Sequence, residues 1–290
     1  MGLQRSAIDS AVIAGAVIIA SAIAWASSQG GAALCGVPVM MLCAAIAFTL
    51  QWLAFVPAYW KQTEHFYDLV GSLTYILVTG FALVASRPTD ARSTILGLLV
   101  LIWASRLGSF LFRRVRLAGS DPRFDEIKPR ASRFLVAWTL QGLWVFLTLC
   151  AALAAITTMT PAALGTLDGL GVAIWVIGFA IEVSADRQKS RFRAENPGHY
   201  AHTGLWAWSR HPNYFGEIVL WIGVALIAAS TLRDWQWITM VSPVFVFLLL
   251  TRVSGIPLLE KRADDRWGDQ ESYQQYKANT PALFPRPPRR

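Results

Sequence analysis

The chain has 290 residues, of which 54% are hydrophobic and only 15% are charged. Soluble globular domains carry about 25% charged residues, so this composition argues against an ordinary soluble enzyme, and its richness in apolar residues excludes a disordered chain. The formal net charge is +8, and the positions of the basic residues decide whether nucleic acid or a membrane explains it.

Eight apolar runs follow one another, each close to the length of about 20 residues that a membrane-spanning helix needs. They are Ala7–Ala26, Leu34–Ala58, Asp68–Ser86, Thr94–Phe112, Phe134–Thr158, Leu164–Ala185, Phe215–Thr231 and Trp235–Gly255. The runs are too long and too uniformly apolar to be strands of a soluble α/β protein. The sequence therefore predicts an all-α fold, a polytopic integral membrane bundle of about 7–8 transmembrane helices.

Only short polar links separate the runs, so we expect a single membrane domain over residues 1–290. Within it, residues 1–60 would supply the N-terminal helices, 61–160 the helices on the substrate side and 161–290 the cofactor-binding half. The first run could be a signal peptide, because Ala24-Trp25-Ala26 resembles a cleavage site. Its length and Asp9 instead favour a true span.

Lysine and arginine concentrate in the links after the fourth and sixth runs and in the tail after Gly255, whereas the links Ser27–Ala33 and Met159–Thr166 contain neither. Cytoplasmic loops carry an excess of these residues. An even number of spans would then place both termini and all basic loops in the cytoplasm, at the inner membrane if the chain is bacterial. This bias accounts for the net charge, so we expect no nucleic-acid partner.

Cysteine and histidine give no sign of a metal site or a disulfide. The three cysteines lie inside apolar runs and are expected to be buried thiols; they are Cys35, Cys43 and Cys150. Three histidines share one polar link, but no carboxylate or cysteine stands at ligand spacing with them, so we expect no metal; they are His199, His202 and His211.

The sixth run ends in charged residues. Glu182, Asp186, Lys189 and Arg193 recur at helical spacing and therefore share one face. Two acids four residues apart repel each other unless a partner lies between them, and an ionisable group near the membrane core is a functional candidate by default. A salt-bridged helix end, in which the acids pair with Lys189 and Arg193, is the alternative interpretation.

A second polar motif, Arg-His-Pro-Asn-Tyr at residues 210–214, begins the seventh run. Pro212 suits the first position of a helix, and the exposed N–H groups of that helix beside Arg210 would bind an anion. Asn213 and Glu217 lie one turn apart. Three aromatic side chains could stack on a cofactor ring or form the aromatic belt of the membrane interface; they are Trp206, Trp208 and Tyr214. The ends of runs six and seven thus predict a pocket for a nucleotide-type cofactor.

These residues give the chain its resemblance to a known superfamily. The stretch Glu182–Gly223 resembles the C-terminal region of the steroid 5-alpha-reductases, nearest an uncharacterised bacterial branch, the domain of unknown function of the DUF1295 type. The Arg-His-Pro-Asn-Tyr motif also occurs in sterol C14-reductases, and isoprenylcysteine carboxyl methyltransferases share a related Arg-His-Pro-x-Tyr-x-Gly pattern. The resemblance is weaker over residues 100–145 and 250–285 and thin at the N-terminus.

The reductases of this superfamily hold NADPH against a helical membrane bundle, so the resemblance implies NADPH here. Together with the motif above it gives a set of cofactor-binding candidates. They are Arg106, Arg130, Glu182, Asp186, Arg193, Tyr200, Arg210, His211, Asn213, Tyr214, Glu217 and Glu260. The 2′-phosphate of NADPH suits arginine forks, for which Arg193, Arg191 and the group Arg113-Arg114-Arg116 are candidates.

The steroid enzymes pair a Glu and a Tyr to polarise an enone carbonyl, and this sequence departs from that pair. The Tyr position holds Trp103, and the Glu position most nearly matches Asp68, so the substrate need not be a steroid. A desolvated Asp68 could stay protonated and donate to a developing enolate, with Tyr67 and Gln141 as further catalytic candidates. A helix N-terminal charge is the alternative role for Asp68.

The resemblance therefore implies an NADPH-dependent membrane reductase. It would transfer hydride to the activated C=C of a lipophilic, steroid- or isoprenoid-like enone that enters from the bilayer. Two alternatives stay open: an S-adenosylmethionine-dependent membrane methyltransferase and a non-catalytic subunit of a membrane complex.

Overall fold

The computed structural model describes residues 2–86, 90–118 and 124–288. The described residues contain eight helices that are long and apolar enough to cross a membrane, which confirms the predicted all-α bundle and makes the chain an integral multi-pass membrane protein. The α-helices of the described residues are α1 (Gly2–Ala26), α2 (Val39–Trp60), α3 (Tyr67–Ala85), α4 (Ala91–Ala118), α5 (Ala131–Ile156), α6 (Thr166–Glu195), α7 (Pro212–Ala229), α8 (Val241–Leu248), α9 (Ile256–Trp267) and α10 (Glu271–Asn279). Helices α1 to α7 supply seven of the eight candidate spans, and the eighth, Asp234–Trp267, includes α8 and α9.

The chain forms two compact units. The first comprises residues 1–168 and 227–242, and the second comprises residues 169–226 and 243–290. The expected division into residues 1–60, 61–160 and 161–290 stays a prediction. The single domain and the cytoplasmic position of the termini stay predictions.

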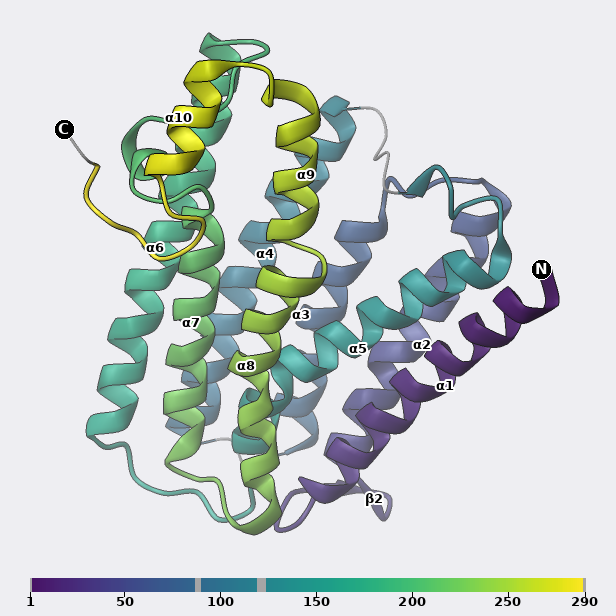
Figure 1. Ribbon diagram of the computed structural model, residues 1–290. Helices are drawn as coiled ribbons and strands as arrows, with labels where there is room; N and C mark the ends of the chain where they lie inside the picture. Colours follow the sequence, from purple (N-terminus) through teal and green to yellow (C-terminus); the bar gives the residue numbers. More distant parts are fainter. Residues whose placement is uncertain (1, 87–89, 119–123, 289–290) are drawn as a thin grey trace. The chain divides into compact units, whose positions relative to one another are not determined.

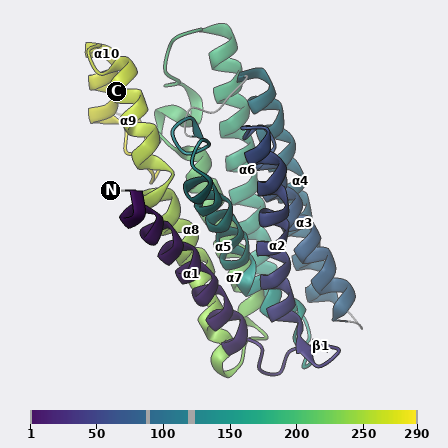
Figure 2. The same cartoon turned by 90° about the vertical axis from the view of Figure 1, so that its right-hand side faces the viewer.

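Helix α5 forms the core of the first unit. It packs against α1, α2, α3 and α4, and Figure 2 shows it between α1 and α2. All residues from Val145 to Ile156 are buried, as expected for a helix that is apolar on every side. The surrounding helices instead expose apolar residues such as Ile18 and Leu53, which are each 65% exposed and would face lipid.

The second apolar run begins later than expected. Residues before Val39 form a short hairpin of β1 (Ala33–Leu34) and β2 (Val37–Pro38). Cys35 lies in its turn with a φ of 51° and is exposed, so the expectation of a buried thiol is wrong there, whereas Cys43 and Cys150 are buried. The apolar composition of residues 32–38 hid the turn.

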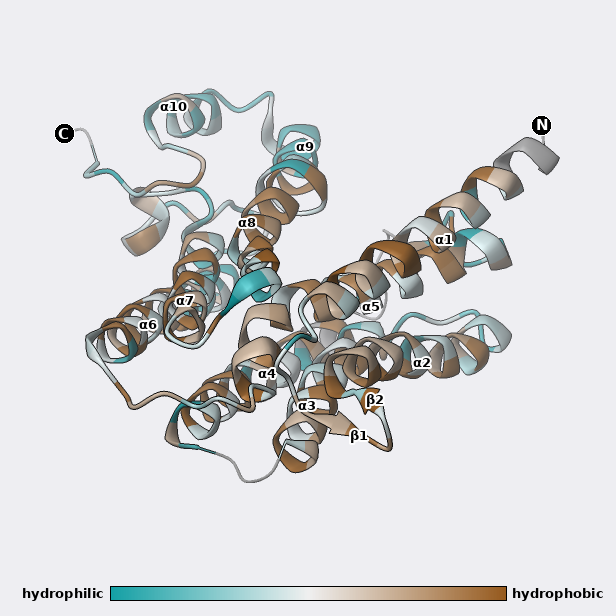
Figure 3. Ribbon diagram, turned by 90° about the horizontal axis from the view of Figure 1, so that it is seen from below, coloured by the Kyte–Doolittle hydropathy of each residue, from teal (hydrophilic) through white to brown (hydrophobic). Residues whose placement is uncertain are grey.

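The sixth and eighth runs also differ from their expected ends. Helix α6 continues to Glu195, ten residues beyond Ala185, because the charged stretch that follows the apolar run is itself helical. The eighth run passes from α8 through the π-helical segment Leu249–Val253 and then into α9. Figure 3 shows the accompanying change from hydrophobic α8 to hydrophilic α9 and α10.

A buried ion pair closes the link between α5 and α6. The Nε atom of Arg92, at the start of α4, lies 2.7 Å from Oδ1 of Asp168, and its Nη2 atom lies 2.9 Å from Oδ2. The same guanidinium donates to the carbonyls of Ala162 and Ala163, both at 2.9 Å. Arg92 and Asp168 are 1% and 3% exposed, so this arginine holds the link in place.

Candidate cofactor site

Glycines bring α6 and α7 into direct backbone contact, and Figure 1 shows the two helices side by side. Gly171 and Gly178 on α6 are seven residues apart, as are Gly216 and Gly223 on α7, so each pair lies on one helix face. A Cβ atom on Gly178 would lie 2.6 Å from the carbonyl oxygen of Gly216, and one on Gly216 would lie 2.6 Å from the amide nitrogen of Glu182. Only glycine permits this approach.

The contact gathers polar residues of both helices. Asn213, in the first turn of α7, donates from Nδ2 to Oδ1 of Asp186 on α6 at 3.2 Å. Glu182 lies one turn before Asp186, and its backbone touches Gly216, the neighbour of Glu217. Glu182, Asp186 and Glu217 are 3%, 5% and 8% exposed. The structure thus brings together four of the predicted cofactor-binding residues.

The link after α6 folds back along that helix. Trp206, in the short 3-10 helix η2 (Gly204–Ala207), is 3% exposed and donates its indole N–H to the carbonyl of Ala185 at 2.9 Å. The Nζ atom of Lys189 lies 4.2 Å from the centre of its ring. Because one ring face is covered and the residue is buried, Trp206 packs the link and offers no open stacking surface. Trp208, by contrast, is 44% exposed.

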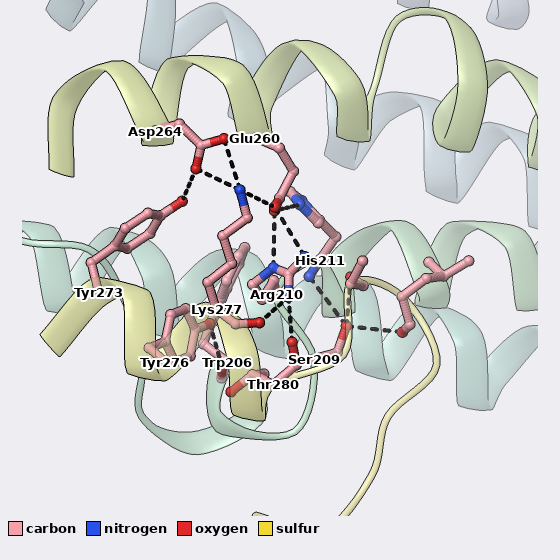
Figure 4. A network of polar contacts seen from close by, with 12 residues as sticks. Trp206, Ser209, Arg210, His211, Glu260, Asp264, Tyr273, Tyr276, Lys277 and Thr280 are labelled. Atoms are coloured by element: carbon pink, nitrogen blue, oxygen red, sulfur yellow. Dashed lines mark hydrogen bonds and ion pairs between the residues drawn. The ribbon is translucent and has the colours of Figure 1, made fainter. Parts of the chain in front are cut away.

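Arg210 ties this link to the C-terminal part of the chain (Figure 4). Its Nε and Nη2 atoms form a fork on Glu260 of α9, at 3.1 and 3.0 Å. Its Nη1 atom donates to the carbonyls of Lys277, at 2.8 Å, and of Thr280. Lys277 in turn binds Asp264 at 2.6 Å. In this structure Arg210 therefore contacts acceptors within the protein.

His211 directly precedes α7 and is 5% exposed. Its Nε2 atom lies 2.8 Å from Oε1 of Glu260, and its ring stacks on Tyr214 with centroids 5.7 Å apart. Burial lowers the pKa of His211, the hydrogen bond with Glu260 opposes that shift, and the charges of Lys189 and Arg210 add to it. His211 is therefore neutral near pH 7, and its Nδ1 atom has no hydrogen-bond partner among the described residues.

Tyr200 lies in an aromatic cluster that joins the link to α9 and α10. Its ring centroid is 5.2 Å from those of Tyr273 and Tyr276 and 5.9 Å from that of Trp267. Tyr276 also donates its hydroxyl to the carbonyl of Trp206 at 2.6 Å. The ring of Tyr200 is thus held by protein neighbours, which fixes the link against the C-terminal helices.

The arginine candidates for a 2′-phosphate differ in their surroundings. Arg193 is exposed near the end of α6, on the face that carries Asp186. Arg191 is engaged by Glu195, with Nε and Oε1 2.7 Å apart. Arg113 is exposed, and the side chains of Arg114 and Arg116 lie outside the described residues. Contact of any of these arginines with a 2′-phosphate stays a prediction.

Two other predicted cofactor ligands belong to the first unit. The guanidinium carbon of Arg106 lies 5.2 Å from the ring centre of Phe110 on the same helix, α4. Arg130 is exposed at the N-cap position of α5. Their contact with a cofactor stays a prediction.

The catalytic candidates also lie in the first unit, where α3 begins beside α5. Tyr67 donates its hydroxyl to the carbonyl of Ala137 at 2.9 Å, and its ring packs edge-on against Trp138. Asp68 is half-buried in the first turn of α3, where the helix dipole favours a negative charge. Gln141 of α5 is 8% exposed and donates from Nε2 to the carbonyl of Tyr67 at 3.2 Å. The structure thus brings Tyr67 and Gln141 into contact.

Trp103, which the resemblance places where the steroid enzymes have Tyr, is buried in the first unit. It is 2% exposed and packs edge-on against Tyr75, with ring centroids 5.0 Å apart.

The Oε1 atom of Gln141 is buried and has no hydrogen-bond partner among the described residues.

Several residues that shape the site were missed at the sequence level. Gln188 accepts from the amide of Leu205 at 2.8 Å, and Ser209 donates to the carbonyl of Leu283 at 2.9 Å. These contacts involve backbone atoms, so residue type gave no signal for them. The equal seven-residue spacing of the glycines in α6 and α7 is a signal that could have predicted the helix contact.

The fold and the polar site define a multi-pass membrane protein whose candidate site lies at the polar ends of α6 and α7. Residues 54–280 match the family described as "Protein of unknown function (DUF1295)", and the chain belongs to this family. The resemblance seen in the sequence is confirmed by this match together with similarity to steroid 5-alpha-reductases.

Three relatives show the range of this similarity. An uncharacterized protein of Schizosaccharomyces pombe is 26% identical over 262 residues, covering 75% of this chain and 72% of that protein. The steroid 5-alpha-reductases DET2 of Arabidopsis thaliana and Gossypium hirsutum are 27% identical over 118 residues and 29% identical over 117 residues. Each match covers 40% of both chains, so the chain spans about two fifths of the length of these reductases. No solved structure matches significantly.

Proposed function

We propose that this chain is a membrane reductase that uses NADPH to reduce the activated C=C of a lipophilic enone. One observation carries the proposal: α6 and α7 meet at glycines and gather Glu182, Asp186, Asn213 and Glu217 at their polar ends. Similarity to steroid 5-alpha-reductases supports a reductase as the class of enzyme.

The chemistry of these residues fits a dinucleotide. Carboxylates such as Asp186 and Glu217 accept hydrogen bonds from ribose hydroxyls or from an amide, and Asn213 can both donate and accept. The dipole of α7 makes its N-terminus favourable for the negative charge of a phosphate. Arg193, exposed on the same face of α6 as Asp186, can form a fork on a 2′-phosphate, which would distinguish NADPH from NADH.

We propose that Asp68, Tyr67 and Gln141 are the residues that handle the substrate. NADPH, when bound, supplies the hydride. The helix dipole favours the charged form of Asp68, so our proposal requires that desolvation by bound substrate keeps it protonated. Asp68 would then donate to the carbonyl oxygen of the enone as negative charge develops there. Tyr67 already donates its hydroxyl to Ala137, so we assign it the role of supporting the start of α3. The buried Oε1 of Gln141 offers an acceptor for a polar group of the substrate.

A lipophilic substrate suits a protein that lies within a bilayer, because an apolar pocket selects apolar ligands. Sterol-like and isoprenoid enones are the classes we propose. Such a substrate would reach the enzyme laterally from lipid.

Ligand-dependent thermal stability tests the proposed cofactor. The protein, purified in detergent, is heated with NADPH, NADH or S-adenosylmethionine; a ligand at a hundredfold excess over its Kd stabilises by about 2.7 kcal/mol. We expect NADPH to raise the melting temperature most and Arg193→Ala to abolish the preference for NADPH over NADH. Arg187→Ala, which removes another exposed arginine of α6, is the matched control and should keep that preference.

The same experiment addresses the alternatives. The Arg-His-Pro motif is compatible with a methyltransferase, and stabilisation by S-adenosylmethionine alone would replace the reductase with that function. A protein that none of the three ligands stabilises would refute the proposed enzyme and favour a non-catalytic membrane subunit.

A further inference from the structure

The last part of the chain runs along the link that leads into α7. We call residues 280–286 the C-terminal strap. The backbone amide of Arg210 donates to the carbonyl of Pro281 at 2.9 Å, and the amide of Arg286 donates to the carbonyl of Trp208 at 3.0 Å. Two main-chain hydrogen bonds in opposite directions therefore align the strap with residues 208–210.

Side chains strengthen this pairing. The hydroxyl of Ser209, which is fully buried, lies 3.2 Å from the carbonyl of Ala282 and 2.9 Å from that of Leu283. Leu283 is 7% exposed, and the ring of Phe284 lies 6.3 Å from that of Phe215 in α7. The strap thus contacts both the link and the first turn of α7.

Arg210 connects the strap to α9. Its side chain is 14% exposed and reaches three places at once: the carboxylate of Glu260, the carbonyl of Lys277 at the end of α10, and the carbonyl of Thr280 in the strap. Four of the five N–H donors of a guanidinium are used in these contacts. A lysine carries the same charge but lacks the planar fork that serves these acceptors together.

We propose that Arg210 is a positioning residue that couples docking of the C-terminal strap to cofactor binding at the N-terminus of α7. Arg210 is followed by His211 and Pro212, the first residue of α7, and it precedes Asn213 by three residues. A docked strap therefore fixes the main chain from which the first turn of α7 begins. The inference rests on the proposed function, because it assumes that a cofactor binds there.

Coupling of this kind is reciprocal. If a docked strap raises the affinity for cofactor, then bound cofactor must hold the strap down by the same factor. This gives two independent readouts: the affinity for NADPH, and the rate at which trypsin cuts the bond between Lys277 and Ala278 just before the strap.

The affinity readout compares Arg210→Ala and Arg210→Lys with the wild type, and with Arg262→Ala as a control on an exposed arginine of α9. We expect both Arg210 variants to bind NADPH about tenfold more weakly, within the usual coupling range of roughly 5–150-fold. The loss should be similar at low and high salt, because positioning is not screened as a direct phosphate contact is. Ser209→Ala, which loses only the hydroxyl contacts with the strap, should show a smaller loss in the same direction.

The protease readout follows cleavage after Lys277 by mass spectrometry in the full-length protein. NADPH should slow this cleavage in the wild type, and both Arg210 variants should be cut several times faster in the absence of NADPH. Ser209→Ala keeps the test valid if an Arg210 variant does not fold.

The outcomes separate this inference from the proposed function. A wild type that fails to bind NADPH refutes the proposed function, and the coupling with it. A wild type that binds NADPH while both Arg210 variants bind equally well overturns the coupling alone. An Arg210→Lys variant that keeps full affinity while Arg210→Ala loses it in a salt-dependent manner would show direct phosphate contact and would also overturn the inference.

Discussion

Gly216→Ala tests the helix contact on which the candidate site depends. The new Cβ atom would lie 2.6 Å from the amide nitrogen of Glu182 and from the carbonyl oxygen of Gly178, and 3.0 Å from the Cα atom of Glu182. These are backbone atoms of α6, so the helices must separate. Overpacking of this kind costs about 1–3 kcal/mol, partly offset by the roughly 0.5–1 kcal/mol that alanine gains over glycine in a helix.

The net loss is about 0–2.5 kcal/mol, so we expect Gly216→Ala to lower the melting temperature in detergent by up to roughly 10 °C. Gly169→Ala is the control, because a Cβ atom at Gly169 meets nothing within 4 Å, and it should leave the melting temperature unchanged or raise it. Gly223→Ala should destabilise similarly, since its Cβ atom would lie 2.6 Å from the carbonyl oxygen of Gly171.

The two glycines of α7 differ in their distance along the helix from the polar residues. Gly216 is next to Glu217, whereas Gly223 lies two turns further along α7. Gly216→Ala should therefore weaken NADPH binding more than Gly223→Ala at equal loss of stability. The reasoning is refuted if Gly216→Ala is as stable as Gly169→Ala.

Two further predictions concern buried polar residues. Arg92→Met should destabilise the protein by about 3–5 kcal/mol, because it leaves Asp168 as a buried charge, whereas the double variant Arg92→Met/Asp168→Leu should recover most of that loss. The double-mutant cycle is completed by measuring unfolding of these two variants and of Asp168→Leu alone. A double variant no more stable than Arg92→Met would contradict this prediction. The pKa of His211 is lowered in the folded protein, so as pH falls this histidine is protonated in the unfolded chain first. The contribution of neutral His211 to folding stability is therefore present above about pH 6.5 and declines below it. Thermal unfolding between about pH 7.5 and 5.5 should show a weaker pH dependence in His211→Gln than in the wild type, and an identical dependence would show that His211 does not titrate differently on folding.

Long apolar runs made the membrane bundle predictable from the sequence. A segment such as Phe134–Thr158 is too long for a strand and too apolar for a surface helix, and the structure places it as the buried helix α5. The hairpin before Val39 was missed because residues 32–38 are apolar, and the turn at Cys35 depends on backbone conformation that composition does not reveal.

The candidate site was predictable only in part. Asp186 and Arg193 share a helix face by spacing alone. The approach of Asn213 depends on the contact between α6 and α7, which the glycine spacing signals only when the two helices are compared. The engagement of Arg210 could not be foreseen, since two of its acceptors are backbone carbonyls of residues more than 60 positions away. Trp206 was expected to offer a surface for stacking on a cofactor ring. Its burial depends on contact with Lys189 and on the fold of the link, which the sequence does not reveal.

Equilibrium binding of NADPH to the purified full-length protein tests the central claim most directly. The wild type is compared with the double variant Asp186→Asn/Glu217→Gln, which keeps side-chain size but removes two carboxylate acceptors. We predict saturable binding of one NADPH per chain by the wild type and binding weakened about tenfold or more, equal to at least 1.4 kcal/mol, in the double variant. Absence of saturable binding by the wild type, or equal affinity in the double variant, would contradict the assignment of this site to the cofactor.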